Sequence, residues 1–245
     1  MSVFDFYPVH EKKYLGRLSN SEIKSAIFGC DKMLSMTNKN LEVENNFPWS
    51  LPKRKIESVL RPYLQKDFVA IAEIGTHIGT TATRFADFIK SNPDSYILCI
   101  DTWLSDVADY IIRRDGMKYI LRQGNDHLLF DLFIQNIQNN KLEKSVIPFR
   151  LTSLQAGQIL YYYGIQFDII YIDASHEYLN VKHDLELYFE LLSPGGTMLG
   201  DDYNIDGVKR ALDEFVGAKN LKITLEEGEF LNSVQQIFWK IEFPE

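Results

Sequence analysis

The chain has 245 residues, 45% of them hydrophobic and 13% aromatic, which is enough for one α/β domain with additions. Its formal net charge of −8 argues against nucleic acid as a ligand, because nucleic-acid binding depends on neutralising phosphates. No stretch approaches the ~20 apolar residues of a membrane span. The N-terminus lacks a signal-peptide pattern, and two cysteines are too few for a disulfide framework. We therefore expect a cytoplasmic protein that binds neither nucleic acid nor a membrane.

Residues 1–66 are a mixed segment that we expect to form a helical cap on the main domain. A polar run at residues 19–21 indicates one helix start, and Pro52 suits the first turn of a second helix. The basic run at residues 53–55 is interpreted as the solvated start of that helix, since it is too short to suggest a nucleic-acid site.

Residues 67–245 alternate between strand and helix patterns. Short apolar runs typical of strands occur at residues 68–74, 96–100, 146–149, 167–172, 197–199, 221–224 and 234–239. Several are separated by segments whose apolar side chains recur every three or four residues, as on one face of a helix. This alternation predicts an α/β fold with a doubly wound, mostly parallel, Rossmann-like sheet of seven strands.

The first strand of this domain ends in an acid and a turn that contains two glycines. Glu73 precedes Gly75, and Gly79 opens the following helix. Glycines let a backbone approach a ligand, and a helix N-terminus offers unpaired amides. An acid at this place would repel a pyrophosphate but suits an ammonium group, which S-adenosylmethionine (SAM) carries beside its sulfonium. We expect Glu73, Gly75, Thr76, Gly79 and Thr80 to bind this end of SAM.

The second and third strands are followed by further candidate cofactor residues. Asp101 closes the second strand, where a carboxylate suits the ribose hydroxyls of a nucleoside; this feature alone fits NAD equally well. Thr102 and Trp103 come next, and Trp103 is expected either to stack beside the adenine or to be a core aromatic. Thr152 and Ser153 open the helix after the third strand, as an N-cap does.

The connection between the second and third strands is much longer than a helical crossover requires. The extra residues of this connection, at about 103–127, follow the carboxyl end of a parallel strand, where ligands bind in such folds. We interpret it as a lid over the substrate. The alternative is a loop that packs against a neighbouring subunit of a homo-oligomer.

Three more acids follow the fourth and fifth strands. Asp173 closes the fourth strand, and Asp201 and Asp202 close the fifth, so a parallel sheet brings them to one edge. Crowded carboxylates repel one another unless a cation lies between them, and oxygen ligands favour Mg²⁺ or another hard divalent cation. In the alternative, Asp201 caps a turn and Asp202 faces solvent. His176 follows Asp173 by three residues, and imidazole suits proton removal at neutral pH; its alternative is a helix cap.

These motifs resemble known families. The turn Glu-x-Gly-x-x-x-Gly at residues 73–79 resembles motif I of the class I SAM-dependent methyltransferases. Phe-Asp-Ile-Ile-Tyr-Ile-Asp-Ala-Ser-His-Glu-Tyr at residues 167–178, Leu-Leu-Ser-Pro-Gly-Gly at 191–196, Gly-Asp-Asp-Tyr at 200–203 and the helix at 206–215 resemble the metal-dependent sugar O-methyltransferases of macrolide and aminocoumarin pathways. Cephalosporin-biosynthesis methyltransferase-like proteins belong to the same broad family. The similarity covers roughly residues 68–240.

The resemblance implies roles for the residues at these positions. Asp173, Asp201 and Asp202 match the aspartates that bind Mg²⁺, and Asp173 also counts among the cofactor-binding residues. His176 matches a histidine that is the general base in the macrolide enzymes. Other members have an aspartate two residues after the first metal ligand, where this chain has Ser175. The turn that holds residues 152–153 borders the adenine in this fold.

The expected function is therefore the Mg²⁺-dependent transfer of a methyl group from SAM to a hydroxyl of a small acceptor. The resemblance implies a natural-product pathway and a sugar-containing acceptor. Two other functions fit part of the pattern. An NAD-dependent oxidoreductase shares the fold and Asp101 but gains nothing from three clustered aspartates. A non-catalytic SAM-binding module would require neither the metal ligands nor His176.

Overall fold

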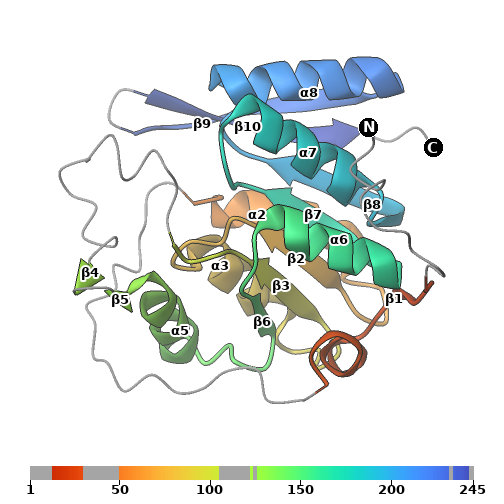
Figure 1. Cartoon of the computed structure of the whole chain (residues 1–245), viewed down its shortest axis with the longest axis vertical. Coiled ribbons are helices and arrows are strands. Elements are labelled where there is room, and N and C mark those ends of the chain that lie inside the picture. Colours follow the sequence, from red (N-terminus) through yellow and green to blue (C-terminus); the bar gives the residue numbers. More distant parts are fainter. Residues whose placement is uncertain (1–12, 30–49, 105–121, 124–125, 232–233, 243–245) are drawn as a thin grey trace.

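A computed structural model describes residues 13–29, 50–104, 122–123, 126–231 and 234–242 (Figure 1). The helices are α1 (Asn20–Ile23), α2 (Lys53–Leu60), α3 (Thr80–Ile89), α5 (Leu129–Asn139), α6 (Ser153–Tyr163), α7 (Tyr178–Phe189) and α8 (Asp206–Lys219), with a π-helix at Lys24–Phe28 and a 3₁₀ turn at Arg61–Tyr63. The strands are β1 (Gly16–Arg17), β2 (Ala70–Ile74), β3 (Tyr96–Ile100), β4 (Arg122–Gln123), β5 (Asp126–His127), β6 (Val146–Phe149), β7 (Ile165–Ile172), β8 (Leu192–Gly200), β9 (Lys222–Leu231) and β10 (Val234–Glu242).

The central sheet confirms the predicted fold class. Seven strands follow the order β6-β3-β2-β7-β8-β10-β9, and β1 adds a short parallel pairing with β7. All neighbours along this path are parallel except β10, which runs antiparallel to both β8 and β9. The five residues of β2 and the five of β3 are buried on both faces, which explains why these strands appear in the sequence as continuous apolar runs.

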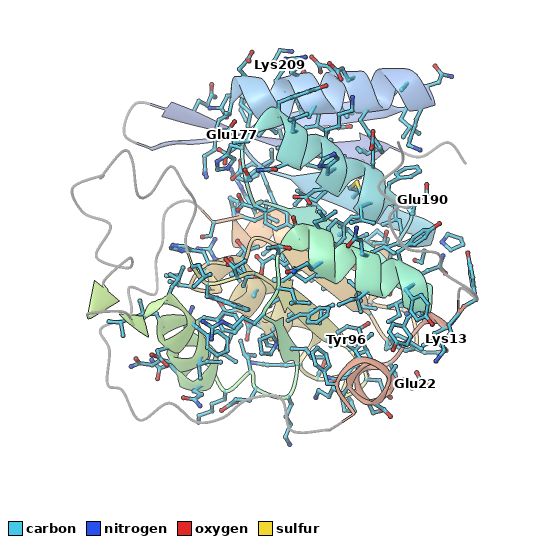
Figure 2. All side chains as sticks on the ribbon, in the orientation of Figure 1. Lys13, Glu22, Tyr96, Glu177, Glu190 and Lys209 are labelled. Atoms are coloured by element: carbon cyan, nitrogen blue, oxygen red, sulfur yellow. The ribbon has the colours of Figure 1, made fainter. Side chains whose placement is uncertain are left out.

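Helices cover both faces of the sheet and separate the core into two layers (Figure 1). Residues of α2, α3 and α5 pack in one cluster with alternate strand residues such as Ile71 and Tyr171. Residues of α6, α7 and α8 pack in the other, with Ala72 and Ile170. In Figure 2, Glu177 and Glu190 mark the N-cap and C-cap of α7 on the second face. None of the helices in the described ranges is long and apolar enough to cross a bilayer.

The described part of the N-terminal segment contacts both layers. Leu18 and Ile23 join the core under α6 and α7, whereas Leu51 and Ile56 join the core under α3. The expected cap is thus divided between the two faces. The expected lid at 103–127 lies largely outside the described residues, which include only its beginning and the β4–β5 pair.

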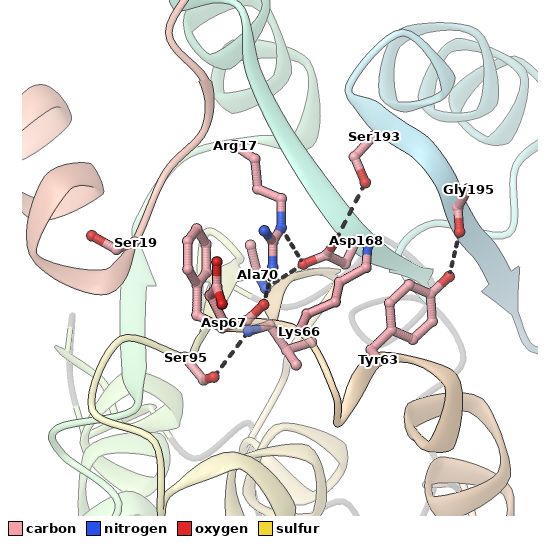
Figure 3. A network of polar contacts seen from close by, with 12 residues as sticks. Arg17, Ser19, Tyr63, Lys66, Asp67, Ala70, Ser95, Asp168, Ser193 and Gly195 are labelled. Atoms are coloured by element: carbon pink, nitrogen blue, oxygen red, sulfur yellow. Dashed lines mark hydrogen bonds and ion pairs between the residues drawn. The ribbon is translucent and has the colours of Figure 1, made fainter.

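A buried ion cluster ties the N-terminal segment to the sheet (Figure 3). Asp168 on β7 is fully buried; its Oδ2 lies 2.8 Å from Arg17 Nε, and its Oδ1 lies 2.7 Å from Lys66 Nζ. Oδ2 also accepts a hydrogen bond of 2.9 Å from the amide of Ala70 on β2. A single carboxylate therefore joins β1, β2 and the segment that precedes β2.

The sequence pattern Ser-Pro-Gly-Gly at residues 193–196, which favours a type II turn, lies inside β8, and Gly195 at its third position has the positive φ that this turn requires. The register between β7 and β8 is irregular, because Phe167 pairs with Leu192 and Ile169 pairs with Thr197. The turn residues therefore form a bulge in β8, with Gly195 at a φ of 71°.

Candidate active site

The carboxyl edge of the sheet gathers the residues that the sequence singled out. Ile172 on β7 pairs with Gly200 on β8, so the residues that follow them, Asp173 and Asp201, leave adjacent strands at the same level. Ile74 on β2 pairs with Ile172 in the same parallel arrangement. The turn after β2 and the loops after β7 and β8 therefore share one edge.

Three side chains at this edge could hold a cation. The ligand atoms of Asp173, His176 and Asp202 all lie within 4.8 Å of one another. His176 Nε2 is 2.7 Å from Asp202 Oδ2, and the Tyr171 hydroxyl donates a hydrogen bond of 3.2 Å to Asp173 Oδ2. The side chains of His176 and Asp202 are 39% and 24% exposed, although His176 Nε2 itself is buried.

Charge repulsion accompanies this arrangement. Burial and the charge of Asp202 raise the pKa of Asp173, whereas His176 and the Tyr171 hydroxyl oppose the rise. Burial and the charges of Asp173 and Asp202 also raise the pKa of Asp201. A bound cation would offset this repulsion, so the donor set fits a hard divalent ion.

Asp201 lies outside this cluster, which differs from the expected set of three aspartates. Its Oδ1 accepts a hydrogen bond of 2.7 Å from the Asp202 amide, and its Oδ2 accepts one of 3.2 Å from Gln236 Nε2. Its carbonyl oxygen accepts a hydrogen bond of 2.9 Å from Trp239 Nε1. Both carboxylate oxygens are thus engaged, and Asp201 anchors the site to β10.

Asp202 adopts a backbone conformation that is uncommon for a residue with a side chain. Its φ is 60°, in the left-handed region, where aspartate and asparagine are enriched. The hydrogen bond from its amide to Asp201 Oδ1 stabilises this turn. The local geometry therefore directs the Asp202 carboxylate towards His176 rather than into solvent, contrary to the alternative role considered for Asp202.

The glycines of the turn after β2 are required by the protein's own packing. Gly75 has a φ of 85°, and a Cβ added there would lie 2.1 Å from the carbonyl oxygen of Asp173. Gly79 has a φ of 81°, and a Cβ there would lie 2.8 Å from the Phe133 ring. The turn consequently lies against the strand end that carries Asp173.

Asp101 holds this turn in place. Its Oδ2 accepts hydrogen bonds from the amides of Thr76 at 2.9 Å and His77 at 2.8 Å, and its Oδ1 accepts one of 2.7 Å from the Trp103 amide. Each carboxylate oxygen has two lone pairs, so Oδ1 keeps one for a further donor. Asp101 therefore orders the predicted cofactor turn and retains acceptor capacity for a hydroxyl.

Glu73 is a buried acid that suits a cationic ligand. Its side chain is on β2, the residue is 1% exposed, and the Cys99 thiol lies 3.9 Å from its Oε2. Burial raises the pKa of Glu73 well above its ordinary value, and the charges of Asp173 and Asp101 add to the rise. The Thr80 hydroxyl in the first turn of α3 is also buried, without a hydrogen-bond partner among the described residues.

The structure corrects the expectation that Trp103 stacks beside an adenine. Trp103 is fully buried, its indole Nε1 donates to the His77 carbonyl at 2.7 Å, and its ring centroid is 4.8 Å from those of Phe130 and Phe133. No surface of the ring is left for a ligand. The alternative, a core aromatic, describes this residue. The neighbouring Thr102 accepts a hydrogen bond of 3.2 Å from the Leu104 amide.

The expected helix cap at Thr152 is confirmed. Thr152 Oγ1 accepts a hydrogen bond of 3.2 Å from the Gln155 amide as part of a capping box. The Ser153 carbonyl accepts one of 2.8 Å from the Tyr188 hydroxyl, which links α6 to α7. Both residues follow β6, at the same edge as Asp101, which follows the neighbouring β3.

The sequence analysis did not predict that Lys55 is buried near the site. Lys53 and Arg54 are exposed, as expected. Lys55 is only 8% exposed, so the prediction that the whole basic run is solvated is wrong for this residue. Its amine pairs with the Glu226 carboxylate and lies 4.6 Å from the centre of the Phe238 ring. Its charge also opposes the rise in the pKa of Asp201. In the neighbouring sequence, only the apolar Ile56 that follows Lys55 indicated that Lys55 is buried.

A small pocket opens beside the acidic cluster. Its walls include Asp173, His176, Val181, Val208 and Trp239. It is bounded by α7 on one side and by the start of α8 on the other, so polar groups at the sheet edge meet apolar side chains from two helices.

Comparison with known proteins places these residues in a family. A family model described as a methyltransferase domain matches residues 72–203, more than half of the chain. The uncharacterized protein R132 of Acanthamoeba polyphaga mimivirus is 23% identical over 139 residues, which are 57% of this chain and 53% of R132. The chain thus spans about half the length of this curated relative.

Solved structures share the fold. An O-methyltransferase from Bacillus cereus in complex with SAH is 16% identical, with a TM-score of 0.54, over 81% of this chain and 85% of its own. The O-methyltransferase TomG from Streptomyces achromogenes, involved in tomaymycin synthesis and solved with SAM, is 15% identical, with a TM-score of 0.56, over 77% and 78%.

The family match bears on the choice between a methyltransferase and an oxidoreductase that Asp101 alone left open, since the matching model describes a methyltransferase domain. The matched residues begin at Ala72 in β2 and end at Tyr203, so they include the Glu73 turn and the edge that carries Asp173 and Asp202. The chain belongs to this methyltransferase-domain family.

Proposed function

We propose that this protein transfers a methyl group from SAM to a hydroxyl oxygen of a small molecule, with a divalent cation at the acidic cluster. The observation that carries the proposal is the convergence of Asp173, His176 and Asp202 within 4.8 Å, next to the glycine turn of the cofactor motif. Methyl transfer to oxygen requires a group that removes a proton, and this cluster contains one beside two carboxylates.

The residues present fit Mg²⁺. Asp173 and Asp202 offer carboxylate oxygens, which hard cations prefer, and the exposure of the cluster leaves room for the waters that Mg²⁺ retains. A bound cation would supply positive charge beside the acceptor oxygen. Asp201, the third aspartate of the expected set, holds the backbone from which Asp202 projects.

The residues present also fit SAM. Glu73 would bind the ammonium group, which would offset the cost of burying its carboxylate. Asp101 would accept a ribose hydroxyl through its remaining lone pair, while Gly79 and Thr80 would border the methionine end. Thr152 and Ser153 would border the adenine. SAM supplies a methyl group made electrophilic by the sulfonium.

His176 would act as the base. Its Nε2 lies 2.7 Å from Asp202 Oδ2, and this carboxylate would stabilise the imidazolium formed when His176 takes the proton. The protein must also align the acceptor oxygen with the methyl carbon, and such alignment can account for ~7–11 kcal/mol of a barrier. The glycine turn and the loop after β7 would hold the two reactants.

The acceptor class rests on resemblance. The loop after β7 resembles that of sugar O-methyltransferases, and TomG, which shares the fold, is involved in tomaymycin synthesis. We infer a small natural-product acceptor, and a sugar-containing one fits the resemblance.

The test is an assay of SAM with a panel of hydroxylated sugars and aromatic compounds, with and without Mg²⁺. Methyl transfer should stop in excess EDTA and return when Mg²⁺ is added, while calorimetry should show SAH binding in both conditions. Undiminished transfer in EDTA would contradict the metal assignment. Failure to bind SAH would contradict the cofactor assignment.

A further inference from the structure

The segment at residues 172–176, which contains the end of β7 and most of the loop to α7, is contacted by three glycines from different parts of the chain. Gly75 follows β2, Gly200 ends β8, and Gly207 is in the first turn of α8. A Cβ added at these positions would lie 2.1, 2.4 and 2.2 Å, respectively, from a carbonyl oxygen of this segment. At all three positions, therefore, backbone packs directly on the backbone that carries Asp173 and His176.

Gly207 is the position where this contact can be tested in isolation. Gly75 has a positive φ, so any side chain there is strained in its own backbone. A Cβ at Gly200 would also collide with the ring of Trp239. The backbone of Gly207 is in the first turn of a right-handed helix, which alanine adopts readily.

The atoms that a side chain at Gly207 would meet belong to the backbone next to the imidazole. A Cβ there would lie 2.2 Å from the His176 carbonyl oxygen, 3.3 Å from its carbonyl carbon and 3.0 Å from the Tyr178 amide nitrogen. A backbone cannot rotate away as a flexible side chain can. A methyl group at Gly207 must therefore displace the His176 backbone or the start of α8.

The same connection also carries the partner of His176. Asp202 lies between β8 and α8, and its Oδ2 is 2.7 Å from His176 Nε2. Residues 201–207 thus supply both the carboxylate that faces the imidazole and the surface against which the backbone of His176 packs. A shift of this connection at Gly207 therefore changes the distance between the Asp202 carboxylate and the His176 imidazole.

We propose that Gly207 is a positioning residue, whose missing side chain sets the place of the His176 imidazole relative to Asp202. The proposal rests on the role proposed above for His176 as base. It adds a residue that touches neither cofactor nor acceptor but on which the geometry of the base depends.

The experiment compares Gly207→Ala with Gly217→Ala in the same helix. A Cβ at Gly217 would meet nothing within 4 Å. Both substitutions raise helix propensity by a similar amount, about 1 kcal/mol, so their difference isolates the contact with His176. The imidazole signals of both variants are recorded by NMR at one pH. The His176→Ala variant assigns the His176 signal, and the exposed His183 on α7 is the internal reference.

Gly207→Ala should shift the His176 signal and leave that of His183 in place. It should also lower kcat by about 10²-fold, the effect expected of a displacement of roughly 1 Å, while the affinity for SAH stays within two-fold. Gly217→Ala should change neither the His176 signal nor kcat. In the double variant Gly207→Ala/His176→Ala, kcat should equal that of His176→Ala, because Gly207 acts through His176.

An unchanged His176 signal, or losses in kcat that add in the double variant, would overturn the proposal. If the wild-type protein methylates no tested hydroxyl, the proposed function fails, and the NMR comparison still decides the role of Gly207. If Gly207→Ala does not fold, the same substitution is made together with Asp184→Asn, which removes a buried acid from α7, and is compared with Asp184→Asn alone. An unmoved His176 signal in that comparison would overturn the proposal.

Discussion

His176 Nε2 lies 2.7 Å from Asp202 Oδ2, and this contact joins the loop after β7 to the loop after β8. Two chemical roles are compatible with it. In one, the carboxylate orients a general base. In the other, both side chains are ligands of the same cation, since their ligand atoms also lie within 4.8 Å of those of Asp173. The two roles differ in what happens to metal binding when the imidazole is removed.

His176→Ala should lower the rate of methyl transfer by roughly 10²–10⁴-fold, the usual contribution of a general base. Mg²⁺ should still bind, and the loss of rate should be smaller at high pH, where hydroxide can remove the proton. Initial rates between pH 6 and pH 10 and calorimetry with Mg²⁺ measure both effects. The matched variant Asp202→Asn should weaken Mg²⁺ binding while SAH binding survives. Equal loss of Mg²⁺ binding in both variants would show that His176 is a metal ligand.

Glu73→Gln should have opposite effects on stability and on cofactor binding. The buried carboxylate is disfavoured by its surroundings and by the charges of Asp173 and Asp101, so a neutral amide should raise the melting temperature of the free protein. The same change removes the charge proposed to bind an ammonium group, and SAH affinity should fall at least about ten-fold, the cost of losing one charged hydrogen bond.

Asp101→Asn is the comparison for Glu73→Gln. Asp101 accepts three backbone hydrogen bonds, so its replacement should lower both the melting temperature and the SAH affinity. Thermal unfolding and calorimetry distinguish the two patterns. A lower melting temperature in Glu73→Gln would contradict the view that Glu73 is retained for ligand binding at the expense of stability.

Asp168→Ala should destabilise the fold by about 3–5 kcal/mol, because it breaks a buried ion cluster and leaves Arg17 and Lys66 without their partner. Asp87→Ala is the matched control, since Asp87 also pairs with two lysines, Lys53 and Lys90, but at the surface. Its loss should cost less than about 1 kcal/mol. Urea unfolding measures both, and similar costs would contradict a special role for the buried cluster.

Asp184→Asn should stabilise the protein in a pH-dependent way. Burial raises the pKa of Asp184 on α7 from 3.8 to about 7, although a hydrogen bond from Ser153 opposes the rise. Between these values the unfolded chain has released a proton that the folded protein keeps, so wild-type stability falls as the pH rises through this range. The cost at pH 8 is on the order of a few kcal/mol, since each pKa unit corresponds to about 1.4 kcal/mol.

The advantage of Asp184→Asn over wild type should therefore be small at pH 4, grow up to about pH 7 and remain constant above that. Glu190→Gln, at the exposed C-cap of the same helix, is the control and should show no such growth. Melting temperatures measured at several pH values test this. A constant difference between Asp184→Asn and wild type would show that the pKa of Asp184 is the same in the folded and unfolded chains, contrary to the raised value.

The fold could be predicted because its signals are local. The buried runs at residues 70–74 and 96–100 have strand length and are bounded by turn residues, and alternation with helices leaves few topologies open. The acids at strand ends were found for the same reason, because parallel strands place Asp173 and Asp202 at one edge. The helix cap at Thr152 depends only on its neighbours within three residues.

The remaining details depend on partners distant in sequence. The orientation of Asp201 is set by Gln236 on β10, and the burial of Lys55 depends on Glu226 on β9. Local periodicity contains no information about either pairing. For Trp103 the sequence left two roles open, stacking on the adenine or packing in the core, and Phe130 and Phe133 of α5 place it in the core. Side-chain direction was thus the main error, whereas the placement along the sheet edge was right.

The bonds from Gln236 and Trp239 to Asp201 have a consequence for biosynthesis. A chain is synthesised from its N-terminus, and a domain generally folds as a unit. The acids of the site emerge early, but the antiparallel strand that anchors one of them, β10, is inserted between β8 and β9 only after residues 234–242 have left the exit tunnel. Until then Asp201 lacks two of its partners, so a nascent chain that already contains every acid at the sheet edge still lacks the active site's final geometry.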